Sequence, residues 1–144
     1  MEVFKKAHLQ VNTDLGALTQ VLSWFDQFNS AIIPPSVWLQ CQLALAEGFT
    51  NAVRHAHQNC PEETPIDMEI TLIDQTLEIR IWDSGAGFNL SQKLDEMPPE
   101  IGQDAEGGRG LKLMQQMSDL LSYTQTGDRR NCLLIVKRFE GEEA

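Results

Sequence analysis

Three short motifs along this chain combine residue types that could do chemistry. The first is a polar stretch with helical spacing, the second an acidic turn that contains two glycines, and the third a glycine-rich string ahead of an apolar pattern. They are Glu47-Gly-Phe-Thr-Asn51-Ala-Val-Arg54-His55-Ala, Asp83-Ser-Gly85-Ala-Gly87 and Gly107-Gly108-Arg109-Gly110-Leu111. Each motif alone has an ordinary structural explanation, so their order along the chain carries the interpretation.

The first motif depends on helix geometry. Residues four apart lie on one face of a helix, so Glu47, Asn51 and His55 are expected to line one side, with Arg54 beside them. A carboxylate placed there can act as a general base for a hydroxyl group. The amide oxygen of Asn51 is a hard ligand that suits Mg²⁺. For this segment alone, the alternative is a solvated polar helix face.

The second motif follows an alternating apolar pattern that predicts a strand ending at Asp83. Gly85 and Gly87 permit a close backbone approach or a positive φ where a flat ligand must enter. A carboxylate at that point can accept a hydrogen bond from an exocyclic amine such as that of adenine. The alternative is a plain Asp-Ser-Gly turn.

The third motif, Gly107 to Gly110, leads into a predicted helix. Unpaired backbone N–H groups and the positive end of the helix dipole favour an anion such as a phosphate, although a loop without a ligand explains the string equally well. No Walker lysine motif is present, and no G-x-G-x-x-G string follows a first strand, which excludes the P-loop and Rossmann sites. Together the three motifs indicate a site for ATP.

Composition limits the classes of protein that fit. The 144 residues, 42% of them hydrophobic, predict one domain over residues 1–144 that can bury a core. The 11 basic and 21 acidic residues give a net charge of −10, which disfavours nucleic acid and anionic membranes as direct partners. The three cysteines predict buried thiols in a reducing compartment rather than a disulfide framework. No segment approaches the roughly 18 apolar residues of a membrane span, so we expect a cytoplasmic protein.

Periodicity predicts the elements that position the motifs. Strands are expected at 3–11, 66–72, 77–83, 121–125 and 132–139, and helices at about 15–28, 35–58 and 109–121. The fold class that follows is α+β, a two-layer sandwich in which helices cover one face of a mixed or antiparallel sheet. The segment 15–28 could instead present a dimer or partner surface.

Residues 88–106 lack clean periodicity and contain two prolines, which predicts a mobile lid. This lid is acidic, and Lys93 is its only cation. Arg54, Arg109 or Lys112 would therefore have to supply further positive charge to a triphosphate. The last four residues, 141–144, are predicted to be a frayed tail.

The three motifs resemble the N, G1 and G2 boxes of the GHKL superfamily, the Bergerat-fold ATPases, and more narrowly those of bacterial anti-sigma factor serine kinases. The similarity extends from about residue 3 to residue 138. It implies Mg·ATP binding, with Asn51 on the metal, Asp83 on adenine and Glu47 as the base. The nucleotide-binding residues that it implies are Asn51, Arg54, His55, Asp83, Gly85, Gly87, Gly108, Arg109, Gly110 and Leu111.

The resemblance also implies partners. Members of the family bind a sigma factor and phosphorylate a serine on a STAS-domain antagonist, often as homodimers. Two alternatives stay open: a nucleotide-gated module that sequesters its partner without phosphotransfer, and a stand-alone ATP hydrolase, which is disfavoured because no transducer domain is visible. One position departs from the pattern, since the last strand commonly begins Gly-Thr and this chain has Asn131-Cys132.

Overall fold

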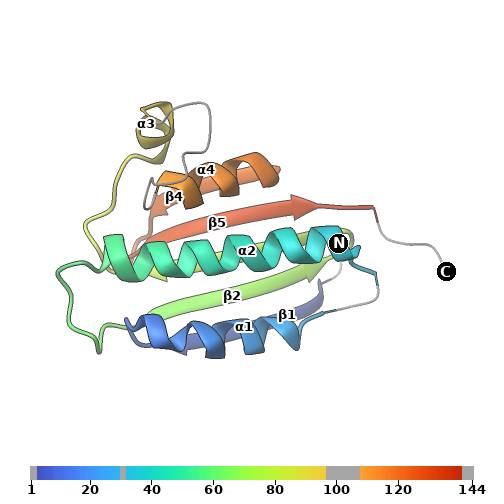
Figure 1. Ribbon diagram of the computed structural model, residues 1–144, viewed down its shortest axis with the longest axis horizontal. Coiled ribbons are helices and arrows are strands. Elements are labelled where there is room, and N and C mark those ends of the chain that lie inside the picture. Colours follow the sequence, from blue (N-terminus) through green and yellow to red (C-terminus); the bar gives the residue numbers. More distant parts are fainter. Residues whose placement is uncertain (1–2, 30–31, 97–107, 141–144) are drawn as a thin grey trace.

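The computed structural model describes residues 3–29, 32–96 and 108–140, and it contains one five-stranded antiparallel sheet (Figure 1). The strand order across the sheet is β1-β2-β3-β5-β4. The strands are β1 (Val3–Val11), β2 (Ile66–Ile73), β3 (Thr76–Asp83), β4 (Leu120–Gln125) and β5 (Asn131–Arg138). The predicted α+β class is confirmed, and the sheet is antiparallel rather than mixed.

Three helices lie over one face of the sheet: α1 (Leu18–Asp26), α2 (Pro35–Asn51) and α4 (Gly108–Met117) (Figure 1). A short 3-10 turn, Leu15–Ala17, precedes α1 and is capped by the side chain of Asp14. Helix α2 begins at Pro35, whose missing N–H would have no helical partner in the first turn. Trp38 of α2 stacks on Phe25 of α1 at 4.1 Å between ring centroids, which joins the two helices.

Alternation along β3 explains how the sheet meets the helices. Leu77, Ile79 and Ile81 are buried, whereas the intervening residues are half-buried. Side chains alternate between the two faces of a strand, so one face joins the core and the other stays partly exposed. The same alternation places Asp83, the last residue of β3, on the core side.

The predicted helix 35–58 is correct only to residue 51. From Ala52 to Ala56 the chain forms a π-helical turn, η2, in which the His57 N–H donates to the Ala52 carbonyl at 2.8 Å. The wider turn changes which side chains face inward, so His57 is buried at 2% exposure while His55 is exposed. His55 therefore differs in exposure from Glu47 and Asn51, which are half-buried.

Helix α4 also ends earlier than predicted, at Met117 rather than at residue 121. The Ser118 hydroxyl donates to the Met114 carbonyl at 2.5 Å, and the Asp119 N–H donates to Val136 of β5. These hydrogen bonds end the helix and direct the chain into β4, which pairs with β5 from Leu120 onward.

The described part of the predicted lid contains an ordered element. Asn89 caps a short helix, α3 (Leu90–Asp95), by accepting a hydrogen bond from the Gln92 N–H at 2.9 Å. Leu90 and Leu94 are buried, which explains why these residues fold although their period was not evident from the sequence. Residues 97–106 of the predicted lid, Gly107 and the predicted tail 141–144 lie outside the described residues.

The three cysteines are all free, but only Cys41 is buried, whereas Cys60 and Cys132 are half-buried. The prediction of buried thiols was wrong for the latter two. Within residues 3–29, 32–96 and 108–140, no helix has both the length and the apolar character needed to cross a membrane.

Candidate functional site

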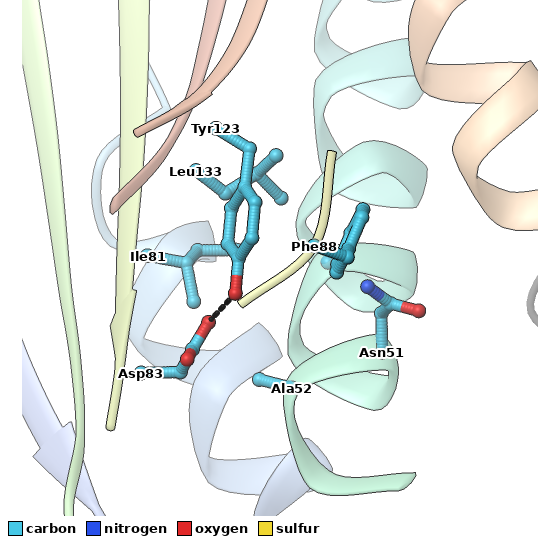
Figure 2. A pocket seen from close by; sticks show the side chains of 8 residues that line it. Asn51, Ala52, Ile81, Asp83, Phe88, Tyr123 and Leu133 are labelled. Atoms are coloured by element: carbon cyan, nitrogen blue, oxygen red, sulfur yellow. Dashed lines mark hydrogen bonds between the residues drawn. The ribbon is translucent and has the colours of Figure 1, made fainter. Parts of the chain in front are cut away.

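A small cavity of about 10 Å³ lies beneath α2, at the end of the sheet where β3 stops (Figure 2). Its walls come from α2, η2, β3, β4 and β5 and from the loop that follows β3. The lining residues are Gly48, Asn51, Ala52, Ile81, Asp83, Phe88, Tyr123 and Leu133. The first two motifs, predicted separately from the sequence, therefore meet at one cavity.

Asp83 is 4% exposed and is held by donors from distant parts of the chain. Its Oδ1 atom accepts hydrogen bonds from Asn131 Nδ2 and from the Gly85 N–H, both at 2.9 Å. Its Oδ2 atom accepts from the Tyr123 hydroxyl at 2.8 Å (Figure 2). Burial, and then the hydrogen bond to Asp83, raise the pKa of Tyr123, so this hydroxyl keeps its proton.

Asn131 stands where the family pattern has Gly-Thr. The register of β3 and β5 places it directly opposite Asp83, and its amide donates both to Asp83 and to the Gly85 carbonyl at 2.9 Å. In this chain a side-chain amide therefore orients the carboxylate by direct contact. The sequence showed the departure but not this contact.

Both glycines of the acidic turn are needed for its shape. Gly87 has φ +82°, a conformation that side chains rarely adopt. A Cβ on Gly85 would collide with the carbonyl oxygen of Ala56 in η2. The turn after β3 thus packs directly against the end of the first motif.

Phe88, the residue after Gly87, stacks on Tyr123 with 4.5 Å between ring centroids and 24° between ring planes. The Lys93 ammonium group of α3 lies 4.9 Å from the centroid of the same Phe88 ring. In Figure 2 the Phe88 ring lies on the α2 side of Tyr123. Neither aromatic residue was a predicted site residue.

The opposite wall of the cavity carries Asn51. Its Oδ1 atom is buried and has no hydrogen-bond partner among the described residues. One helical turn earlier, Glu47 points its carboxylate at the start of α4, where a Cβ on Gly110 would lie 2.5 Å from Glu47 Oε2. Gly110 therefore permits the close approach of the first and third motifs, and the positive end of α4 faces the carboxylate.

The remaining predicted site residues are placed differently. Arg54 and His55 are exposed on η2 and do not line the cavity. Leu111 is fully buried in the core, and Gly108 begins α4. The side chain of Arg109 lies outside what the structure describes. Their roles toward a nucleotide stay predictions.

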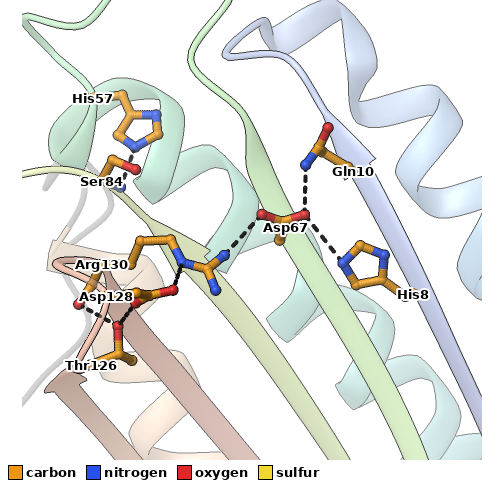
Figure 3. A network of polar contacts seen from close by, with 8 residues as sticks. All are labelled: His8, Gln10, His57, Asp67, Ser84, Thr126, Asp128 and Arg130. Carbon is orange, nitrogen blue, oxygen red and sulfur yellow. Dashed lines mark hydrogen bonds and ion pairs between the residues drawn. The ribbon is translucent and has the colours of Figure 1, made fainter.

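His57 connects the turn after β3 to two other segments. Its Nε2 atom accepts from the Ser84 N–H at 2.7 Å (Figure 3), and its Nδ1 atom lies 2.8 Å from the Thr13 hydroxyl. That hydroxyl donates its only hydrogen to the Thr64 carbonyl at 2.7 Å, so it must accept from His57 Nδ1–H. His57 is therefore a neutral imidazole, and burial lowers its pKa, with the nearby Asp83 charge acting in the opposite direction.

A polar network on the far face of the sheet fixes the turn that presents Asn131 (Figure 3). Arg130 donates to Asp67 of β2 and to Asp128, at 2.9 and 2.8 Å. Asp67 also accepts from Gln10 of β1 at 3.0 Å. The residue before Asn131 is thus tied directly to β2 and, through Asp67, to β1.

Within the described ranges, no three or more His, Cys, Asp or Glu residues gather in a way that could hold a metal ion. The unpartnered Asn51 oxygen nevertheless fits a Mg²⁺ ion that takes one protein ligand and completes its shell with phosphates and water.

Comparison with known proteins agrees with this geometry. The family model described as "Histidine kinase-like ATPase domain" matches residues 11–137. The chain is 36% identical over 83 residues to the serine-protein kinase RsbW of Listeria innocua, across 54% of this chain and 52% of that protein. It is 34% identical over 84 residues to the serine-protein kinase RsbW of Bacillus pumilus, with the same shares covered. The chain therefore spans about half the length of the curated relatives that it matches.

Proposed function

The chain belongs to the family of histidine kinase-like ATPase domains, and from this premise we propose that it binds ATP and transfers the γ-phosphoryl group to a protein serine. The observation that carries the proposal is the cavity itself, which places Asp83 and Asn51 on facing walls. The base would bind at Asp83, where a buried carboxylate can accept the amine hydrogen of adenine. The phosphates would extend toward Asn51 and the start of α4.

Mg²⁺ is part of this proposal, with Asn51 as its ligand from the protein. A buried amide oxygen without a partner costs free energy unless a ligand satisfies it, which favours a metal-bound role. When bound, the ion neutralises phosphate charge. The chain's own contribution is to hold the amide in place from the last turn of α2.

Glu47 is the proposed general base. It lies one turn from Asn51 and beside the first turn of α4, which is where the terminal phosphate would bind. Glu47 would accept the proton of the serine hydroxyl while the serine oxygen bonds to phosphorus and ADP leaves. Arg54, Arg109 or Lys112 would supply positive charge near the phosphates.

The biological role that we propose is that of an anti-sigma regulatory factor. The names of the relatives, serine-protein kinases, support the kinase activity. The proposed partners are a sigma factor and a STAS-domain antagonist that carries the acceptor serine, with the chain acting in the cytoplasm and able to form a homodimer. The alternative is a nucleotide-gated module that only sequesters its partner. Such a module would bind ATP but would not transfer its phosphate to the partner.

One experiment tests both levels of the proposal. The chain is incubated with γ-labelled ATP, Mg²⁺ and a STAS-domain protein, and label on serine is followed alongside the melting temperature. We expect nucleotide to raise the melting temperature, because binding to the native state stabilises it, and label to appear on serine. A melting shift without label would support the sequestering module. No shift at millimolar nucleotide would contradict ATP binding altogether.

A further inference from the structure

The two oxygens of the Asp83 carboxylate accept hydrogen bonds from different parts of the structure. A carboxylate offers about four lone-pair positions, two on each oxygen. On Oδ1 both are taken, by Asn131 Nδ2 and by the Gly85 N–H, and neither of these residues lines the cavity. On Oδ2 the donor is Tyr123, which does line the cavity. Three of the four positions are therefore filled, and the position that remains, on Oδ2, shares its oxygen with the phenolic hydroxyl of Tyr123.

The ring of Tyr123 also fills space. It stacks on Phe88, and both rings line a cavity of about 10 Å³. Sites for small molecules and cofactors usually enclose about 300 to 1,000 Å³. An ATP base with its sugar cannot enter this space until side chains that line it move, and the Phe88–Tyr123 pair fills the part of it beside Asp83. The two rings therefore occupy the space where the adenine base would lie, and the hydroxyl occupies the place of its amine.

We propose that Tyr123 is an affinity-determining residue of the base pocket, because its ring and hydroxyl compete with adenine for the small space beside Asp83 Oδ2 and must be displaced when nucleotide binds. This inference rests on the proposed ATP site and concerns how tightly that site binds. The Tyr123–Asp83 bond stabilises the nucleotide-free form by satisfying a buried carboxylate oxygen. Each binding event then exchanges one hydrogen bond to a charged group for another, so part of the gain from adenine is lost.

The protonation state of Tyr123 is consistent with this competition. Burial raises the pKa of the phenol well above its ordinary value, and the hydrogen bond to Asp83 adds to the shift. The hydroxyl therefore remains a donor throughout the physiological range. Competition between Tyr123 and adenine does not depend on pH near neutrality.

The test uses Tyr123→Phe, which removes the hydroxyl and keeps the ring. We expect this variant to bind ATP about tenfold more tightly than the wild type by calorimetry, since the competing hydrogen bond to a charged group is gone. A purely structural role would give the opposite sign, because a disturbed pocket binds more weakly. Ser122→Ala is the matched control, since it removes a hydroxyl from the neighbouring residue of β4, which faces the other side of the sheet. It should bind like the wild type.

Other outcomes are equally defined. If the wild type binds ATP and Tyr123→Phe binds with equal or lower affinity, the competition is refuted while the proposed function stands. If neither protein binds ATP, both the function and this inference are overturned. Guanosine triphosphate serves as a second ligand, and the gain should be larger for ATP because only adenine offers an amine at that position.

A second measurement works without any variant. Tyr123 is the only tyrosine of the chain, so uniform labelling with fluorotyrosine gives one ¹⁹F signal from this site. We expect saturating ATP and Mg²⁺ to move that signal, since the ring leaves Phe88 and the hydroxyl leaves Asp83. A signal that stays in place when calorimetry shows full occupancy would overturn the proposal.

Discussion

The two ends of the proposed nucleotide site differ in how they are built. At the base end, Asp83 is buried and accepts hydrogen bonds from β4, β5 and its own turn. At the phosphate end, Asn51 Oδ1 is buried with no partner among the described residues, and Glu47 faces the first turn of α4. The Asp83 carboxylate is hydrogen-bonded within the fold, whereas the Asn51 oxygen is left to bind a ligand.

This difference separates stability from function. Groups that are already bonded hold the sheet, the turn and α2 together, so changes there should affect folding as well as binding. Buried polar groups that are left unpaired for a ligand contribute little to the stability of the folded state, and their burial costs free energy. The substitutions below test that separation, in order of decreasing expected effect.

The largest effect is expected for Glu47→Ala, at the phosphate end. Removing a general base should slow serine phosphorylation by on the order of 10² or more, because base catalysis typically contributes that much. Nucleotide affinity and the melting temperature should stay close to those of the wild type. Glu63→Ala, an exposed acidic residue in the loop before β2, is the matched control. Phosphotransfer at the wild-type rate in Glu47→Ala would remove the catalytic role and favour the sequestering module.

Asp83→Asn should lower both the affinity for ATP and the stability of the folded protein. Replacing one carboxylate oxygen with an amide group places a donor where the surrounding groups also donate. A hydrogen bond to a charged group contributes roughly 1.5 to 3 kcal/mol, so ATP affinity should fall by about one to two decades. Unlike Glu47→Ala, this variant should also melt at a lower temperature.

The control for that prediction is Asp74→Asn, because Asp74 is exposed in the turn between β2 and β3, at the opposite end of β3 from Asp83, and does not line the cavity. It should leave affinity unchanged. Base selectivity gives an independent measurement, since only Asp83 is expected to distinguish adenine from guanine. Equal selectivity in the wild type and in Asp83→Asn would show that this carboxylate does not read the base.

Local patterns predicted the parts of the fold that local physics determines. Strict alternation gave the hairpin of β2 and β3, and the proline pair gave the start of α2, because both signals act within a few residues. The π-helical turn was missed because its residues have the same helical composition as α2 before it. Its cause is tertiary: Ala56 meets Gly85, and His57 reaches Ser84.

The same distinction applies to the site. Asp83 and Asn51 stand in short motifs, so they could be picked out from the sequence as candidate site residues, and both line the cavity. Tyr123 and Asn131 reach Asp83 from 40 and 48 residues away, through the register of β3, β5 and β4. No local signal marks such a contact. The one available hint was that closing strands would place inward-facing residues near the end of β3.

Asn51→Ala should have a smaller effect, and one that requires metal. Losing a protein ligand to Mg²⁺ should weaken ATP binding by about tenfold with Mg²⁺ present and much less with the metal chelated. Because the Asn51 oxygen has no partner, removing it should not lower the melting temperature of the nucleotide-free protein as Asp83→Asn does. Asn59→Ala, in the exposed segment after η2, is the control. An equal loss with and without Mg²⁺ would contradict a metal-bound role.

The smallest expected effect concerns pH and the link between η2 and the acidic turn. His57 accepts a hydrogen bond from Ser84 N–H only as a neutral imidazole, and burial lowers its pKa below the value of 6.5 for an exposed histidine. The unfolded chain therefore binds a proton more readily than the folded protein, so stability is lost as pH falls through 6.5 and is unaffected above about pH 7.5. His57→Gln, whose amide oxygen can accept from Ser84 at any pH, should show a shallower decline of melting temperature from pH 7.5 to 5.5. His55→Gln, changed at an exposed position on the same turn, should follow the wild-type curve. If all three proteins decline in parallel, His57 does not couple protonation to the turn, and the acidic turn is held by Asn131 and Gly85 alone.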